Sequence, residues 1–227
     1  MQKDEIISTL KGREVIYALC SDIYLFIPEE KYIETLNAVI NSFMEITENS
    51  ENDNVAENLK KLEQTIKSYL NADKINKRSI LEELHKTYTR LFCLGNAVPL
   101  SESVFISPEH LTKQVSEDKV INLYMQCKFD MHHTANEPKD HLSYELMFMS
   151  YLSKGTYNHI INDNIMEASK LVNLQKYFLN NHLLNWISLF RAVLEKYNEK
   201  IDFYKPITIF LENYLQADKE YLETLEF

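Results

Sequence analysis

Glycine is the residue that most limits how this chain can fold, because its 227 residues include only Gly12, Gly95 and Gly155. Tight β-hairpins and phosphate-binding turns rely on glycine, which adopts a positive φ at little cost. A chain with so little glycine cannot build many such turns. The sequence therefore predicts an all-α, globular multi-helix fold rather than a β-rich or Rossmann-type one.

Charge and cysteine content limit the partners and the cellular compartment that we expect for this chain. The formal net charge is −10, and no basic stripe is visible, so we expect no nucleic-acid partner. Cys20, Cys93 and Cys127 are far apart and odd in number, which favours free thiols in a reducing compartment. The charged amino terminus and the absence of any run of about 18 apolar residues predict a cytoplasmic protein without stable membrane insertion.

Apolar residues recur at helical spacing along the whole chain and predict roughly nine helices. Ser107-Pro108 and Glu137-Pro138 each look like a helix cap followed by proline at the first helical position. Gly95 and Gly155 are predicted to follow the ends of helices. The expected helices cover about 3–26, 32–44, 59–70, 80–92, 108–128, 138–152, 164–180, 183–194 and 203–215.

The longest irregular stretch is predicted at 95–107 and contains Pro99. Long loops inside compact domains are uncommon and often act in function or as hinges. We therefore predict an N-terminal helical lobe at 1–94, a hinge loop at 95–107 and a C-terminal helical lobe at 108–227, together one domain. Such a hinge is compatible with a monomer or with a dimer that exchanges helices.

The start of the helix predicted at Glu137 is polar, whereas the rest of that helix is apolar on nearly all sides, including Tyr144, Met147 and Tyr151. One interpretation is a helix cap, in which Glu137 and Asp140 lie beside unpaired backbone N–H groups. In the other, Asp140, His141 and Glu145 converge on one spot and form part of a functional site, such as that of a metal-dependent helical enzyme.

Signals for catalysis or a cofactor are weak elsewhere. Glu82 and His85 form a single E-x-x-H, whereas di-iron helical bundles need two such motifs and two further glutamates. The tandem His132-His133 does not complete the set. Nucleophile motifs and glycine-rich phosphate loops are not found in the sequence. We therefore expect no catalytic residue, no metal and no cofactor.

Three sequence blocks, in order and at plausible spacing, resemble the TorD/DmsD/NarJ-type chaperones that mature redox enzymes. The blocks are Tyr88-x-Arg90-Leu91-Phe92-x-x-Gly95, then Glu137-Pro138-x-Asp140-His141-Leu142-x-x-Glu145-Leu146-x-Phe148-Met149, then Phe178-Leu179-x-x-His182-Leu183-x-x-Trp186 with Phe203-Tyr204. The second block is the most specific of the three.

The resemblance implies an all-helical, non-enzymatic cytoplasmic chaperone. It would bind the twin-arginine leader, the immature catalytic subunit of a molybdenum-cofactor oxidoreductase, or both, until the cofactor is inserted and the enzyme is exported. By motif match, the peptide-binding residues are Tyr88, Leu91, Phe92, Pro138, Asp140 and His141, with Glu137, Glu145, Phe148 and Met149 in support. Replacing Asp140 or His141 by alanine is expected to weaken binding and leave helicity intact.

This chain lacks two features that are common in the family, and other interpretations of its residues compete with the resemblance. Relatives often have glycine near Lys128 and an aromatic residue in the 95–103 loop, and this chain has neither. Tyr88, Leu91 and Phe92 also lie on a helical stripe, where a core role competes with a binding role. Besides the metal-dependent enzyme, a helical adaptor unrelated to export remains an alternative.

Overall fold

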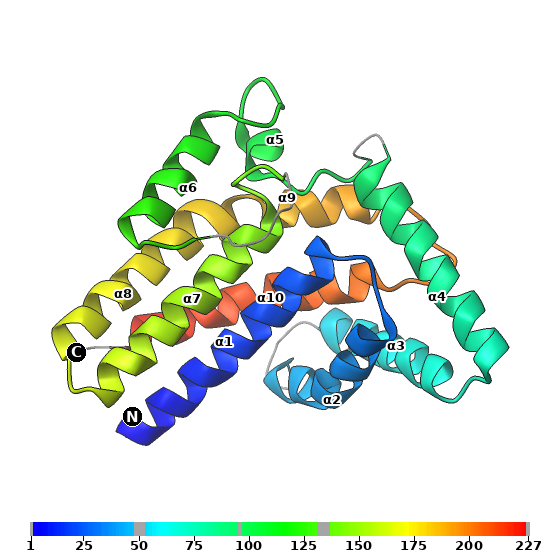
Figure 1. Cartoon of the computed structure of the whole chain (residues 1–227), viewed down its shortest axis with the longest axis horizontal. Helices are drawn as coiled ribbons and strands as arrows, with labels where there is room; N and C mark the ends of the chain where they lie inside the picture. The colour runs from blue at the N-terminus through cyan, green and yellow to red at the C-terminus, as the bar shows by residue number, and fades with distance from the viewer. Residues whose placement is uncertain (1, 48–52, 95–96, 131–136, 226–227) are drawn as a thin grey trace. The chain divides into compact units, whose positions relative to one another are not determined.

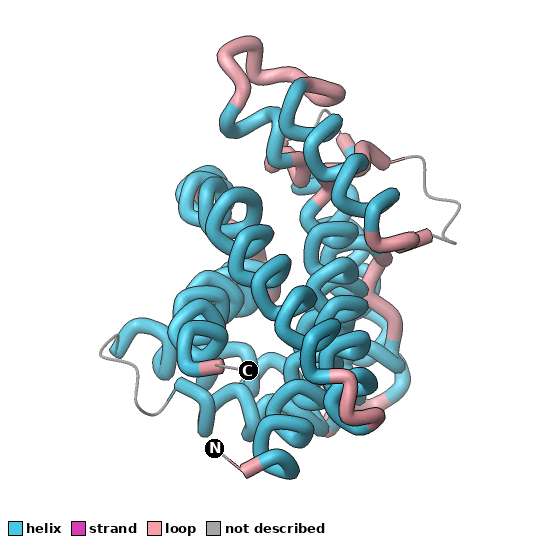
Figure 2. Tube along the Cα trace, turned by 90° about the vertical axis from the view of Figure 1, so that its left-hand side faces the viewer, coloured by secondary structure: helices cyan, strands magenta, loops and turns pink. Residues whose placement is uncertain are grey.

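The computed structural model describes residues 2–47, 53–94, 97–130 and 137–225, and these residues form helices joined by loops (Figures 1 and 2). The predicted all-α class is confirmed, since the β pairing in the described residues is one isolated bridge between Ser101 and His141. The elements are α1 (Lys3–Leu25), α2 (Glu30–Thr47), α3 (Asp53–Leu70), α4 (Lys74–Tyr88), η1 (Thr89–Cys93), α5 (Glu102–Ile106), α6 (Val115–Gln126), α7 (Leu142–Ile161), α8 (Ile165–Phe178), η2 (Leu179–Leu183), α9 (Leu184–Leu194) and α10 (Tyr204–Thr224).

The chain forms two compact units. Unit 1 contains Met1–Leu25, Leu100–Trp186 and Ala217–Phe227, and unit 2 contains Phe26–Pro99 and Ile187–Gln216. The lobes predicted at 1–94 and 108–227 are each continuous in sequence. Unit 1 is not, because it combines α1, from the beginning of the chain, with residues that follow Pro99. The change from unit 2 to unit 1 at Pro99 falls inside the predicted 95–107 segment, and a hinge there stays a prediction.

Unit 1 is built around α7, which runs beside α1 on one side and α8 on another (Figure 1). Gly155 was expected to follow this helix but lies inside it. A Cβ at Gly155 would come within 2.9 Å of Leu171 Cδ1, so glycine here permits the close approach of α7 and α8 rather than ending α7.

A buried ion pair fastens α1 within unit 1. The Arg13 guanidinium donates to both carboxylate oxygens of Asp218, at 2.5 and 2.8 Å, and to Gln175 Oε1 at 2.7 Å. Tyr17 donates its hydroxyl to Asp218 at 2.6 Å. Arg13 and Asp218 are almost wholly excluded from solvent, so losing one partner would leave the other charge buried and uncompensated.

Unit 2 is a helical cluster in which α3 packs against both α2 and α4. The Phe43 ring stacks on Phe210, with ring centroids 3.9 Å apart. Asp73 caps α4 by accepting the Asn76 N–H at 2.9 Å. The π-helical segment η1 continues α4 as far as Cys93. The predicted stop at Gly95 lies outside the described residues, as do residues 48–52 between the second and third predicted helices.

The segment 97–114 differs from its prediction in two ways. The stretch expected to be irregular contains α5, and the helix expected to begin at Ser107-Pro108 begins instead at Val115. Ser107 ends α5, since its N–H and its hydroxyl both donate to the Ser103 carbonyl. His110 and Lys113 then adopt φ values of 53° and 61°, which a helix cannot contain.

The end of α6 has lysine where a glycine is ordinarily favoured. Lys128 has φ 53°; its N–H donates to the Met125 carbonyl and the Phe129 N–H to the Tyr124 carbonyl. This is the Schellman arrangement, whose left-handed residue is usually glycine. The turn is thus formed at Lys128, with a side chain in the left-handed region. None of the described helices is long and apolar enough to cross a membrane.

Replacing Lys128 with glycine should stabilise the fold. Glycine removes the clash of Cβ in the left-handed region, so we expect the free energy of unfolding to rise by about 0.5–1 kcal/mol. The matched control is Lys119→Gly on the exposed side of α6, which should lower it by about 1 kcal/mol. Urea denaturation followed by circular dichroism measures both, and equal losses in the two variants would contradict the assigned turn.

Candidate functional site

The polar segment before α7 is held by the segment before α5, both in unit 1. The Glu102 N–H donates to the Asp140 carbonyl at 3.0 Å, and the Leu142 N–H donates to the Leu100 carbonyl at 2.7 Å. These two bonds flank the bridge between Ser101 and His141. Because the backbone at 140–142 is extended and paired there, α7 begins at Leu142, and the helix start predicted at Glu137-Pro138 is wrong.

The Asp140 side chain acts on α5 rather than on its own helix. Its carboxylate accepts from the Ser101 hydroxyl at 2.5 Å, the Ser103 N–H at 2.7 Å and the Ser103 hydroxyl. The Ser103 hydroxyl also contacts the Ser116 hydroxyl at 2.7 Å, which joins α6 to the same network. Asp140 is fully buried, so its predicted place beside the first N–H groups of its own helix is replaced by the role of a buried clamp on α5.

His141, not Glu137, is the N-cap of α7. Its ring Nδ1 accepts the Ser143 N–H at 3.2 Å, and its φ and ψ of −71° and 139° are those of a residue just outside a helix. Burial lowers the pKa of the His141 imidazole to about 3, so the ring is neutral at pH 7. Glu137 is exposed, and Pro138 is half-buried.

The supporting residues lie in the core of unit 1. Phe148 and Met149 are fully buried, and the Phe148 ring packs edge-on against Phe178 at 4.9 Å. Glu145 is also fully buried, and its Oε2 accepts from the Trp186 indole N–H at 3.1 Å. Burial, and then the nearby Glu102 carboxylate, raise the pKa of Glu145 well above its usual range.

The catalytic alternative required Asp140, His141 and Glu145 to act on one spot. Their side chains instead bond to different partners, which are Ser101 and Ser103 for Asp140, the Ser143 N–H for His141 and Trp186 for Glu145. The E-x-x-H pair is also divided, since Glu82 pairs with Arg78 and His85 contacts the Pro28 carbonyl. His132 and His133 lie outside the described residues.

Tyr88, Leu91 and Phe92 belong to the core of unit 2. Leu91 is fully buried, and the Phe92 ring meets the Tyr204 ring edge-on at 4.9 Å and the Tyr88 ring at 5.5 Å. The packing role that competed with the binding role in the sequence is therefore visible in the structure. Contact of these three residues with a peptide stays a prediction.

Unit 1 contains an open groove of about 330 Å³ between α1, α7 and the residues that follow α6. We call it the α1–α7 groove; its lining is Glu14, Ala18, Ser21, Leu25, Phe129, Asp130, Tyr144, Met147, Ser150, Tyr151 and Lys154. Tyr151 is 40% exposed, so α7 is not buried on all sides as predicted. The regular spacing of Tyr144, Met147 and Tyr151 could have indicated this second apolar face.

Carboxylates stand around the apolar part of this groove. Glu14 lines it and pairs with Lys154 at 3.1 Å, and Asp130 lines it from the residues after α6. Glu137 lies near enough for its charge to raise the pKa of Tyr144, after the larger effect of burial. An apolar floor with carboxylates at its margin suits a peptide that carries cations beside an apolar run.

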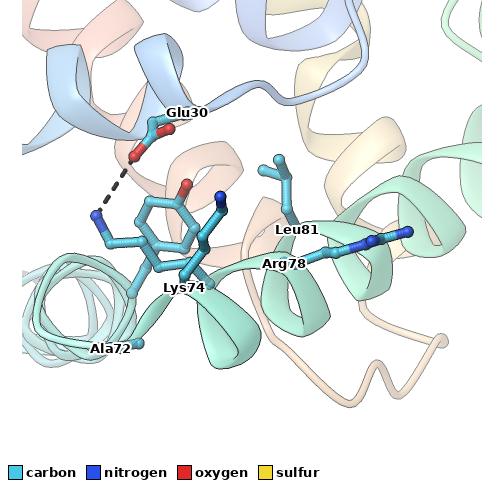
Figure 3. Close-up of a pocket in the computed structure, with 7 residues that line it drawn as sticks. Glu30, Ala72, Lys74, Arg78 and Leu81 are labelled. Carbon is cyan, nitrogen blue, oxygen red and sulfur yellow. Dashed lines mark hydrogen bonds and ion pairs between the residues drawn. The ribbon is translucent and has the colours of Figure 1, made fainter.

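A second hollow, of about 490 Å³, lies in unit 2 and has the opposite character (Figure 3). Its cations are Lys74, Lys77 and Arg78, of which Lys77 pairs with Glu30 at 3.3 Å and lies over the Tyr69 ring. Figure 3 shows Lys74 and Glu30 on opposite sides of this hollow. A basic peptide would be repelled by this surface, which leaves the α1–α7 groove as the better candidate.

Comparison with known proteins supports the resemblance seen in the three sequence blocks. The family model described as nitrate reductase delta subunit matches residues 48–192, which include the first two blocks and the third as far as Trp186. A protein named chaperone protein TorD from a Psychrobacter species is 27% identical over 145 residues, which cover 63% of each chain. Another with that name, from Aliivibrio fischeri, is 31% identical over 87 residues, 38% of this chain and 39% of the relative.

These findings define the class of protein. The chain belongs to the nitrate reductase delta subunit family, and the predicted TorD/NarJ-type resemblance is confirmed. It spans 63% and 39% of the lengths of the two curated relatives that it matches. A solved structure of a candidate redox enzyme maturation protein from Archaeoglobus fulgidus covers 93% of both chains at 18% identity and a TM-score of 0.44. That score is too low to support a structural inference.

Replacing Asp140 with alanine should destabilise the protein, contrary to the expectation from sequence that only binding would suffer. The substitution leaves the Ser101 and Ser103 donors buried without their acceptor, which we expect to cost about 3 kcal/mol of unfolding free energy. Glu109→Ala, an exposed carboxylate in the loop after α5, is the control and should change stability by less than about 0.5 kcal/mol. If Asp140→Ala lowered the free energy of unfolding by less than about 1 kcal/mol, that result would contradict the clamp role.

His141 should make the protein sensitive to acid. Its folded pKa of about 3 lies below the unfolded value of 6.5, so its stabilising contribution is complete above pH 6.5 and is lost as the pH falls toward 3. By pH 5 this loss amounts to about 2 kcal/mol. His141→Asn keeps a side-chain acceptor for the Ser143 N–H and should remove that part of the pH dependence. Urea denaturation at pH 7 and pH 5 tests this, and an unchanged difference between the two pH values would contradict it.

Proposed function

We propose that this chain is a cytoplasmic, system-specific chaperone that binds the twin-arginine leader, the apo form of a molybdenum-cofactor oxidoreductase subunit, or both. It holds this client until the cofactor is inserted and the enzyme is exported, and it performs no catalysis. Membership of the family and the TorD name carried by two relatives support the proposal. A monomer is sufficient for this role, and a helix-exchanged dimer is compatible with it.

The observation that carries the proposal is the α1–α7 groove. A twin-arginine leader has a basic pair followed by an apolar run, and the groove has aromatic, aliphatic and methionine side chains beside carboxylates. Burial of the apolar run would contribute about 25 cal/mol per Å² before entropic costs. Met147 packs adaptably, which suits a client whose apolar run is not of fixed shape. The carboxylates of Asp130 and Glu137 would attract the arginines.

The residues predicted by motif enter this proposal in different ways. Asp140 and His141 are buried, and we assign them the positioning of the α7 start, from which Tyr144 and Met147 reach the groove. Pro138 and Glu137 remain proposed contacts because both reach solvent. Tyr88, Leu91 and Phe92 remain proposed as a second peptide-binding element, with their packing in unit 2 as the established role.

A metal-dependent enzyme using Asp140, His141 and Glu145 is supported less well. The side chains of these residues bond to different partners, and His141 Nδ1 is occupied by the Ser143 N–H. A reacting group would have to displace these buried hydrogen bonds before it met any two of the three. The chaperone proposal needs no such rearrangement.

Introducing a charge into the groove should weaken leader binding. Met147→Lys places an ammonium group on the apolar floor and repels the arginines, so we expect the dissociation constant for a twin-arginine leader peptide to rise roughly tenfold or more. Met125→Lys makes the same change on the exposed side of α6, outside the groove, and should leave binding within about twofold. Calorimetric titration with leader peptides from candidate molybdoenzymes measures both.

Two outcomes distinguish the groove from the function. If wild-type protein binds a leader and the two lysine variants bind it equally well, the groove is not the binding site, although the chaperone role stands. If wild-type protein binds neither any candidate leader nor any immature subunit, the proposed function is wrong. A leader with both arginines replaced by glutamine controls for binding through the apolar run alone.

A further inference from the structure

Three ionisable residues from separate parts of unit 1 meet in its interior. Glu102 is the first residue of α5, Glu145 lies on the first turn of α7, and His182 lies in η2. One ligand atom from each of the three lies within 4.8 Å of the others, and all three side chains are buried. Successive members are 43 and 37 residues apart along the sequence, so no local sequence pattern indicates the cluster.

Several polar atoms of this cluster have no hydrogen-bond partner among the described residues. His182 Nδ1 contacts Glu102 Oε2 at 2.9 Å, and Trp186 donates to Glu145 Oε2. Within the described part of the chain, Glu102 Oε1, Glu145 Oε1 and His182 Nε2 are buried without a hydrogen-bond partner. Buried polar atoms are ordinarily paired, so three such atoms in one cluster indicate a missing partner.

We propose that Glu102, Glu145 and His182 hold a first-row divalent metal ion of the Zn²⁺ type. Two carboxylate oxygens and one imidazole nitrogen are a donor set that suits such ions, whereas Ca²⁺ and Mg²⁺ prefer oxygen alone. Bonds of about 2.0–2.2 Å place ligand atoms roughly 3–4 Å apart, so small side-chain rotations would close the present cluster on an ion.

The contacts around the cluster hold two of its side chains in place. The Trp186 N–H orients the Glu145 carboxylate, and the Phe178 ring stacks on the His182 ring with centroids 4.8 Å apart. Such outer contacts fix the orientation of metal ligands. His182 also lies in a π-helical segment, a feature frequently found at functional sites. The ion would tie α5, α7 and η2 together, and it has no part in leader binding.

The same contacts offer an alternative that the experiment must separate. A proton shared by the Glu102 and Glu145 carboxyl groups would also reduce their repulsion, and it would leave His182 Nε2 unpaired. A metal-free, proton-sharing cluster therefore predicts that purified protein retains no stoichiometric metal. Because the ligand atoms are buried, the ion must be offered while the chain folds.

The test is refolding of the full chain from denaturant, after treatment with a chelator, in the presence or absence of Zn²⁺. After dialysis, mass spectrometry of the metal content should find about one Zn²⁺ per chain in wild type and less than about a tenth of that in Glu145→Gln and His182→Gln. His85→Gln and the double variant His132→Gln/His133→Gln are the matched histidine controls and should retain the ion. Zn²⁺ should raise the melting temperature of wild type and of both controls, and of neither site variant.

Three results would overturn the proposal. Wild type that retains no Zn²⁺ would favour the shared proton, and retention that the site variants do not change would indicate an adventitious ion only. Should the site variants not fold, X-ray absorption of Zn²⁺-loaded wild type still decides the question. One imidazole in an oxygen and nitrogen shell supports the site, whereas sulfur ligands or two imidazoles exclude it.

Discussion

The contact on which the arrangement of unit 1 most depends is made by the Asp140 carboxylate. It receives the Ser103 N–H at the beginning of α5 and the hydroxyls of Ser101 and Ser103, while the backbone beside it pairs with residues 100–102. A negative charge near the first N–H groups of a helix is favourable, and here the charge comes from 37 residues away. This contact sets where α5 begins and where α7 begins, and so brings Glu102 toward Glu145.

The helices could be predicted from the sequence where their burial is periodic. α1, α2, α8 and α9 fall close to the expected ranges because each carries an apolar stripe at helical spacing. α3 ends at Leu70 as expected but begins at Asp53, six residues before its expected start. The beginnings of α6 and α7 could not be predicted, because Ser107-Pro108 and Glu137-Pro138 have the local chemistry of helix starts but are used otherwise. Ser107 closes α5, and the backbone at 140–142 pairs with a distant segment, so tertiary hydrogen bonds overrode local preference.

The site was predictable only in part for the same reason. The motif blocks pointed to Asp140, His141 and Glu145, and these residues do carry buried contacts that shape unit 1. They could not show that the three side chains bond to different partners, or that Glu145 faces Glu102 and His182. One side of the α1–α7 groove could be predicted, because Tyr144, Met147 and Tyr151 have regular spacing in the sequence. The other side could not, because Glu14 and Phe129 reach the groove only through the packing of α1 and α6.

The ion pair of Arg13 and Asp218 bears on the order in which the protein acquires its shape during synthesis. The two residues are 205 positions apart, so α1 leaves the ribosome long before its carboxylate partner exists. Until Asp218 arrives, seating α1 against α7 would bury an uncompensated guanidinium, which is strongly unfavourable. The groove that α1 and α7 share should therefore form only after Asp218 has been synthesised. Any property that depends on this groove would be absent from a chain that stops before Asp218.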